Sequence, residues 1–324
     1  MPNAIRIHQT GEPEVLKWES VEVGNPAADE VRIKHTAVGL NYIDVYHRTG
    51  LYPMPLPFSP GLEAAGVVEA VGTNVTNLKV GDRVAYGTGP IGAYCESRVM
   101  PAEKLVKLPA SIPDKTGAAM MLQGLTSQYL LRRIYKVKQG DTILIHAAAG
   151  GVGLIVCQWA KHLGATVIGT VGSDEKAALA KANGCDYPIV YTREDFQQRV
   201  MEITGGKKLP VVYDSVGKDT FMKSLDCLQP LGMMVIFGNS SGPVAPFDLG
   251  ILASKGSLFL TRPTLANYAG ARKDLVPAAE ELFDVVGKGA VKISVNQTYA
   301  LKDATQAHRD LEARKTTGST VFIV

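Results

Sequence analysis

The stretch Gly140-Asp141-Thr142-Ile143-Leu144-Ile145-His146-Ala147-Ala148-Ala149-Gly150-Gly151-Val152-Gly153 decides the fold of this chain. Its apolar run Ile143-Leu144-Ile145 is typical of a buried strand. Further apolar residues then recur every four positions, as on one face of a helix: Ile155, Trp159 and Leu163. The pattern predicts a strand, a glycine-rich turn and a helix that begins at Val152. Backbone N–H groups at such a junction, with the positive end of the helix dipole, commonly bind the pyrophosphate of a dinucleotide.

The turn departs from the strict G-x-G-x-x-G pattern, because Ala148 stands at the position of the first glycine. Gly150 still allows a ligand to approach the backbone closely, and Gly153 still allows tight packing of the helix on the strand. A turn of this kind can also be purely structural. The strand before it and the amphipathic helix after it favour the dinucleotide site.

The end of the next strand distinguishes NADPH from NADH. Ala165 to Val171 form a second apolar run, and an NAD site places an acidic residue near its end to bond the ribose 2′-hydroxyl. This chain has Gly172 and Ser173 there, which leave room for a 2′-phosphate, and the Lys176 ammonium would stabilise its charge. We therefore predict NADPH as the cofactor. The alternative makes Asp174 the ribose ligand and Lys176 an ordinary solvated helix residue.

The amino-acid composition limits the classes of protein to which this chain can belong. A chain of 324 residues with 46% hydrophobic and 20% charged residues is long enough for two domains with their own cores. The net charge of +3 is small and dispersed, which argues against nucleic acid as the main partner. We find neither the apolar core of a signal peptide nor a run long enough to span a membrane, so we expect a cytoplasmic protein. The four cysteines are far apart and are expected to be reduced, buried thiols.

The pattern of predicted secondary structure changes near residue 125. Before it, short alternating strands are separated by Gly, Pro and Asn turns, which predicts a β-rich, partly closed barrel. After it, strands alternate with helices, which predicts an α/β fold with a doubly wound, six-stranded parallel sheet. The strand candidates are Thr142–Ala147, Ala165–Val171, Tyr187–Val190, Val211–Asp214, Met233–Phe237 and Ser257–Leu260. We expect the tail of the chain to return to the first domain.

The glycine-rich segment and the helix after it carry a longer pattern, made of Gly140, Asp141, Leu144, Ala148-Ala149-Gly150-Gly151, Gly153, Gln158 and Lys161. This pattern resembles the signature of the NADPH:quinone oxidoreductase (zeta-crystallin-like) family, a zinc-free branch of the medium-chain dehydrogenase/reductase superfamily. The resemblance extends through Gly39 to Asp44, Pro60 to Gly66 and Phe237 to Gly242. It implies a β-rich GroES-like catalytic domain over residues 1–124 and 262–324, and a Rossmann dinucleotide-binding domain over residues 125–261.

Zinc alcohol dehydrogenases of this superfamily carry zinc ligands where this chain has other residue types. Asn41 replaces a cysteine, Leu62 replaces a histidine, and the third ligand would fall near Gln123-Gly124. The four-cysteine structural zinc lobe has no counterpart between Met100 and Lys115. Since zinc needs several S or N ligands around one point, we predict no metal site.

Without a metal, alcohol oxidation is a poor expectation, whereas a quinone or conjugated enone delocalises the charge of an incoming hydride. Candidates for the acceptor site follow the strand that ends near Gly39. Asn41 can bond the cofactor or the acceptor carbonyl, and Tyr46 and Tyr52 can stack on a flat ring or donate from the phenol. The alternative is that both tyrosines only wall the domain junction. Asp44 and Arg48 are expected to add polarity at the same edge, with water as the proton source.

The resemblance also implies cofactor-binding residues. Thr126 would lie near the nicotinamide ribose or amide, Gly151 and Val152 at the pyrophosphate, and Tyr191 at the adenosine edge. The nicotinamide half would meet the residues that follow a strand's carboxyl end: Phe237, Gly238 and Asn239. Arg314 would reach back from the tail, with a surface role as the alternative.

Three functions follow from these observations. The leading hypothesis is an NADPH-dependent quinone reductase. The second is a reductase of activated C=C bonds, such as enones or enoyl thioesters. The third, from another class, is a structural or RNA-associated NADPH-binding protein. The resemblance further implies a homodimer joined through the β-prone edge near Ser257–Leu260.

Overall fold

The computed structural model describes residues 1–324 as two compact units. The β-rich unit comprises Met1–Leu125, Leu265–Gly287 and Ile293–Val324, and the parallel-sheet unit comprises Thr126–Thr264 and Lys288–Lys292. The short return of the chain at Lys288–Lys292 is held by Gln158. Its side chain donates to the carbonyl oxygen of Lys292 at 3.0 Å and accepts from the Lys292 N–H at 2.8 Å. This signature residue therefore has a structural task within its unit.

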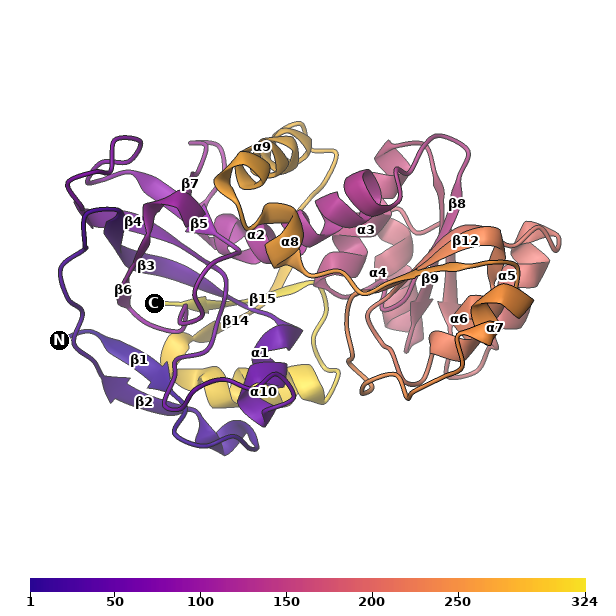
Figure 1. Ribbon diagram of the computed structural model, residues 1–324, viewed down its shortest axis with the longest axis horizontal. Coiled ribbons are helices and arrows are strands. Elements are labelled where there is room, and N and C mark those ends of the chain that lie inside the picture. The colour runs from indigo at the N-terminus through magenta and orange to yellow at the C-terminus, as the bar shows by residue number, and fades with distance from the viewer. The chain divides into compact units, whose positions relative to one another are not determined.

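The parallel-sheet unit is built on six parallel strands in the order β10-β9-β8-β11-β12-β13, which confirms the predicted doubly wound sheet (Figure 1). The strands are β8 (Thr142–Ile145), β9 (Thr166–Val171), β10 (Tyr187–Val190), β11 (Leu209–Asp214), β12 (Leu228–Ile236) and β13 (Phe259–Thr261). The chain starts in the middle of the sheet, moves outward through β9 and β10, and then crosses to β11 on the other side of β8. The topological switch point therefore lies between β8 and β11.

Helices connect these strands. They are α3 (Gly151–His162), α4 (Asp174–Ala182), α5 (Phe196–Thr204), α6 (Phe221–Asp226) and α7 (Gly250–Ser254). Inward-pointing residues of four strands form one buried cluster with Phe196 of α5 and Phe221 of α6: Leu144, Ile168, Val212 and Met234. Helix α5 begins at Phe196, because Asp195 caps it by accepting from the N–H groups of Gln197 and Gln198.

The β-rich unit contains a seven-stranded sheet and a separate hairpin. The sheet runs β14-β15-β3-β4-β5-β7, with β6 also paired to β3, and β1 pairs with β2. The bounds are β1 (Asn3–Arg6), β2 (Lys17–Ser20), β3 (Glu30–Leu40), β4 (Ala64–Val71), β5 (Arg83–Tyr86), β6 (Ser97–Pro101), β7 (Val106–Lys107), β14 (Val295–Ala300) and β15 (Ser319–Ile323). The yellow β15 lies antiparallel to β3 in Figure 1, so the tail does return to this unit.

Helices and loops complete the β-rich unit. The helices are α1 (Tyr42–Thr49), α8 (Leu265–Ala269), α9 (Arg272–Gly287) and α10 (Ala304–Glu312), and α2 (Asp114–Tyr129) begins in this unit. Strand β6 starts at Ser97. The residues before it bond the loop before β4, where the Tyr94 N–H donates to the Pro60 carbonyl at 2.9 Å. All four cysteines are buried free thiols, and none of the helices is both long and apolar enough to cross a bilayer.

The glycine-rich turn is packed so closely that its glycines cannot be replaced freely. A Cβ on Gly153 would lie 2.3 Å from the carbonyl oxygen of Ala147, which itself has a φ of 57°. Real Cβ atoms do not approach backbone oxygens so closely, so the first turn of α3 would have to move away from β8.

We expect Gly153→Ala to lower the free energy of unfolding by about 1–3 kcal/mol, the usual cost of an overpacked position. Urea unfolding followed by the fluorescence of Trp159, which is buried in α3, measures it. Gly287→Ala is the matched control, because a Cβ there meets nothing within 4 Å. Equal unfolding midpoints for both variants would contradict the close approach.

Candidate dinucleotide and acceptor site

The phosphate-binding part of the site lies where β8 meets α3. Gly150 is the N-cap residue, with extended backbone (φ −80°, ψ 175°), and Gly151 and Val152 form the first helical turn. The turn is fixed from both neighbouring strands, because the His146 N–H donates to Tyr213 and the Ala148 N–H donates to Thr170. Free N–H groups and the helix dipole are therefore presented at the switch point of the sheet, which suits a pyrophosphate.

The predicted 2′-phosphate residues come together at the carboxyl end of β9. The Ser173 hydroxyl caps α4 and accepts from the Lys176 N–H at 3.3 Å. A Cβ on Gly172 would lie 2.9 Å from the phenol oxygen of Tyr191, so only glycine leaves that space open. Tyr191 follows β10, which pairs with β9, and its ring is 43% exposed. The four residues thus border one exposed edge of the sheet.

The alternative ribose ligand, Asp174, is already engaged. Arg193 donates two hydrogen bonds to its carboxylate, at 2.5 and 2.7 Å, and this bond lowers the pKa of Asp174. Sequence reasoning missed Arg193, although its place just after β10 and two residues past Tyr191 was a usable signal. The ion pair places the Arg193 guanidinium at the edge that carries Lys176. It also competes with a ribose diol for the Asp174 carboxylate.

The residues predicted for the nicotinamide half follow β12. The Phe237 N–H donates to the Asp214 carbonyl at 2.8 Å, and a Cβ on Gly238 would lie 2.6 Å from the Ser215 carbonyl oxygen. Asn239 continues the same loop, which packs on the residues after β11. Thr126 is buried in α2 within the same unit. The carboxyl ends of β8, β9 and β12 therefore carry three of the predicted groups of cofactor residues.

The acceptor residues gather around α1 in the β-rich unit. Asn41 caps this helix, and its N–H donates to the Asp44 carboxylate at 2.9 Å. The rings of Tyr46 and Tyr52 meet edge to face, with centroids 5.1 Å apart, and Tyr42 adds a third ring 5.5 Å from Tyr46. The structure thus brings the three predicted catalytic residues onto one helix and the loop that follows it.

Asn41 is held by a buried polar chain that the sequence analysis did not include. Its Nδ2 donates to Glu63 at 2.7 Å, and its Oδ1 accepts from Gln123 at 3.0 Å. Gln123 in turn accepts from the Ser319 hydroxyl at 2.7 Å. Burial raises the pKa of Glu63 to about 8. The signal was present in the sequence, because Glu63 directly follows Leu62, one of the replaced zinc-ligand positions.

The sequence analysis expected Asp44 and Arg48 at a polar edge of the acceptor site, and the structure corrects this expectation. Both side chains are fully buried. Asp44 accepts from the Tyr94 hydroxyl at 3.0 Å, and Arg48 pairs with Glu312 of α10 at 2.7 Å. They point inward because their face of α1 packs against the core of the β-rich unit. Burial raises the pKa of Asp44 to about 7.

Arg314 follows α10 in the β-rich unit and is exposed. Its backbone is left-handed (φ 59°), and its N–H donates to the Leu311 carbonyl at 3.0 Å. Its positive charge lowers the pKa of Tyr42, while burial of the phenol raises that pKa more strongly. Arg314 therefore lies within electrostatic range of α1, and its contact with the cofactor stays a prediction.

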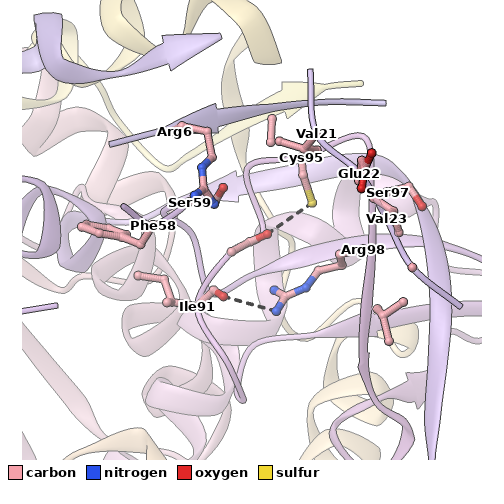
Figure 2. A pocket seen from close by; sticks show the side chains of 14 residues that line it. Arg6, Val21, Glu22, Val23, Phe58, Ser59, Ile91, Cys95, Ser97 and Arg98 are labelled. Carbon is pink, nitrogen blue, oxygen red and sulfur yellow. Dashed lines mark hydrogen bonds between the residues drawn. The ribbon is translucent and has the colours of Figure 1, made fainter. Parts of the chain in front are cut away.

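A concave surface of the β-rich unit, shown in Figure 2, encloses about 430 Å³. Arg6 of β1 and Arg98 of β6 both extend into it, and both donate to backbone carbonyls. None of the predicted site residues lines this cavity. We therefore place the candidate site at α1 and its partners rather than in this hollow.

The replaced zinc-ligand positions carry groups that bond one another. Asn41 and Gln123 form an amide–amide hydrogen bond, and Leu62 has no donor atom. The structure contains no group of three or more His, Cys, Asp or Glu side chains arranged to hold a metal ion. This donor set does not suit zinc, which prefers thiolate and imidazole ligands.

Comparison with protein families gives two matches. Residues 27–110 match the alcohol dehydrogenase GroES-like domain, and residues 151–284 match the zinc-binding dehydrogenase family. The first lies in the β-rich unit, and most of the second lies in the parallel-sheet unit.

Comparison with individual proteins extends over the whole chain. A quinone oxidoreductase from Pseudomonas aeruginosa is 55% identical, with 100% of both chains covered. A 2-haloacrylate reductase from Burkholderia sp is 48% identical, over 100% of this chain and 99% of that protein. The crystal structure of an Escherichia coli quinone oxidoreductase complexed with NADPH superimposes with a TM-score of 0.98 at 50% identity, covering 99% and 100% of the two chains. The chain thus belongs to the zinc-free quinone oxidoreductase family of the medium-chain dehydrogenase/reductase superfamily.

Proposed function

We propose that this chain is an NADPH-dependent quinone oxidoreductase that transfers hydride to quinones without a metal. The observation that carries the proposal is its similarity to named quinone oxidoreductases, at 50–55% identity over the full chain. The site agrees with it, because the Asn41 side chain stands between Glu63 and Gln123 where related enzymes hold zinc.

The residues of the parallel-sheet unit fit NADPH. The space kept open by Gly172 beside the Tyr191 hydroxyl suits the adenosine 2′-phosphate, and Lys176 supplies positive charge at that edge, beside the Arg193–Asp174 ion pair. Gly151 and Val152 would hold the pyrophosphate, and Phe237, Gly238 and Asn239 the nicotinamide half. NADPH, when bound, supplies the hydride.

The residues of the β-rich unit would receive the acceptor. A quinone spreads incoming negative charge over its own ring, so the protein needs mainly to orient the ring and exclude water. Tyr46 and Tyr52 offer adjoining aromatic faces, and the Asn41 amide offers a hydrogen bond to a carbonyl. Water would supply the proton to the reduced quinone.

Steady-state assays with several quinones should show NADPH oxidation by the wild-type enzyme. Tyr46→Phe and Tyr52→Phe should each lower kcat/KM by about three- to tenfold, the effect of one lost hydrogen bond. Tyr187→Phe, at an exposed position of β10, should leave kcat/KM unchanged. Absence of NADPH oxidation with every quinone would overturn the proposed function.

The Burkholderia relative favours a second candidate, reduction of an activated C=C bond. Such a substrate accepts hydride for the same electronic reason as a quinone and needs the same positioning. Initial rates with an enone, with a quinone and with both together rank the two activities at one site. A larger kcat/KM for the enone would make quinone reduction the secondary activity.

Cofactor preference is tested at the 2′-phosphate edge. Lys176→Ala should raise the KM for NADPH by about tenfold and leave the KM for NADH nearly unchanged, because only NADPH carries the phosphate. Lys181→Ala, at the exposed end of the same helix, is the control. An equal loss with both cofactors would assign Lys176 to the helix rather than to the phosphate.

We further propose a cytoplasmic homodimer that joins two copies through β13. This strand ends the six-stranded sheet, and its Phe259 ring is 56% exposed. An unpaired apolar edge favours pairing with a second strand. Phe259→Glu should give a monomer by light scattering, while Leu249→Glu, at another exposed apolar position, should remain dimeric. A monomeric wild type would contradict the proposal.

A further inference from the structure

The side chain of Asn41 belongs to a chain of four buried hydrogen-bonding groups. The carboxyl of Glu63, the amides of Asn41 and Gln123, and the hydroxyl of Ser319 are all buried and follow one another at 2.7, 3.0 and 2.7 Å. They come from the loop before β4, the cap of α1, helix α2 and strand β15. Elements far apart in the sequence thus converge on one amide.

The same heavy-atom positions support two opposite hydrogen-bond directions, because an amide group keeps its shape when its nitrogen and oxygen exchange places. In the direction that the structure has, Ser319 donates to Gln123, Gln123 donates to Asn41, and Asn41 donates to Glu63. In the reverse direction, protonated Glu63 donates to Asn41, Asn41 to Gln123, and Gln123 to Ser319.

Ser319 can end the chain in either direction. Its hydroxyl lies 2.7 Å from Gln123 Oε1 and 3.1 Å from the Ala119 carbonyl oxygen, so its single hydrogen faces two acceptors. After reversal, that hydrogen bonds Ala119 while the hydroxyl oxygen accepts from Gln123. Both directions keep the three hydrogen bonds that link Glu63, Asn41, Gln123 and Ser319, so reversal does not cost any of these three bonds.

Glu63 decides between the two directions. Its Oε1 accepts from the Leu122 N–H at 2.8 Å, so a proton on this carboxyl is directed to Oε2, the oxygen that faces Asn41. A Cβ on Gly39 would lie 2.4 Å from Oε2, which shows how closely the backbone holds the carboxyl in place. An ionised Glu63 can only accept from Asn41, whereas a protonated Glu63 can donate to it.

We propose that Glu63 is a positioning residue that sets the orientation of the Asn41 amide: its ionised form holds the working orientation, and its protonated form reverses the chain and exchanges the nitrogen and oxygen of Asn41. The inference rests on the proposed function, in which Asn41 bonds the cofactor or the acceptor. After reversal, a ligand carbonyl that took an N–H of Asn41 would meet the amide oxygen instead.

The surroundings allow both states of Glu63 near neutral pH. Burial and the nearby Asp44 carboxyl raise the pKa of Glu63 to about 8, against the hydrogen bonds from Asn41 and Leu122 that lower it. The other titratable groups facing it are the buried phenols of Tyr86 and Tyr94, whose own pKa values Glu63 helps to raise. The expected activity therefore rises with pH as Glu63 ionises.

The variant Glu63→Gln separates the two orientations. The Leu122 N–H requires the oxygen of Gln at its side, which turns the Gln NH2 toward Asn41 and fixes the reversed chain at every pH. We expect wild-type kcat/KM to rise about tenfold from about pH 6 to about pH 9.5, as one hydrogen bond is restored, and the variant to stay flat at the lower level. Glu280→Gln, exposed on α9, should follow the wild type.

A second readout does not depend on turnover. The infrared absorption of protonated carboxyls should fall in wild-type protein in two steps, one from Asp44 at about pH 7 and one from Glu63 at about pH 8. The Glu63→Gln variant should keep the first step and lack the second. If Glu63→Gln does not fold, Gln123→Glu provides the same test, since a carboxylate there accepts from Asn41 and favours the reversed chain.

The outcomes are distinct. A Glu63→Gln enzyme that keeps the wild-type rate and pH profile, or a wild type without the infrared titration, overturns the role of Glu63. Wild-type protein that shows the infrared titration but reduces no quinone overturns the proposed function and leaves the hydrogen-bond switch standing.

Discussion

The close approach of α3 to the turn after β8 is the constraint on which the rest of this structure depends. Gly153 allows this approach because it has no Cβ. A Cβ at this position would lie only 2.3 Å from the Ala147 carbonyl oxygen. This approach aims the first N–H groups of α3 at the switch point of the sheet. A larger residue would push the helix outward, so packing of the core and binding of a dinucleotide share one requirement.

The β-rich unit depends in a similar way on β3. This strand pairs with β4, β6 and β15, and then delivers Asn41 to the start of α1. The C-terminal strand β15 also supplies Ser319, the last member of the chain behind Asn41. The return of the tail to this unit therefore completes the support of a candidate catalytic residue as well as the sheet.

Patterns local in sequence were sufficient to predict the six parallel strands, the β8–α3 turn and the place of Gly172 and Ser173 at the end of β9. Each depends on neighbouring residues or on adjacent parallel strands, whose carboxyl ends must meet. The burial of Asp44 and Arg48 could not be predicted this way. Their partners, Tyr94 and Glu312, lie 50 and 264 residues further along the chain, and only the fold brings them together. The role of Glu63 was missed for the same reason, because only the fold brings Glu63, Asn41 and Gln123 within hydrogen-bond distance of one another in a chain.

The chain behind Asn41 also determines the surroundings in which the Glu63 carboxyl carries its charge. A buried carboxyl needs its charge balanced, and a nearby cation usually does this. Amides at Asn41 and Gln123 donate hydrogen bonds but carry no charge, and the charged group that acts on Glu63 is another carboxyl, Asp44. A proton is then the simplest cation available to Glu63. Because burial raises the pKa of Glu63 to about 8, the fold fixes the position of this carboxyl while the pH of the solution sets its charge.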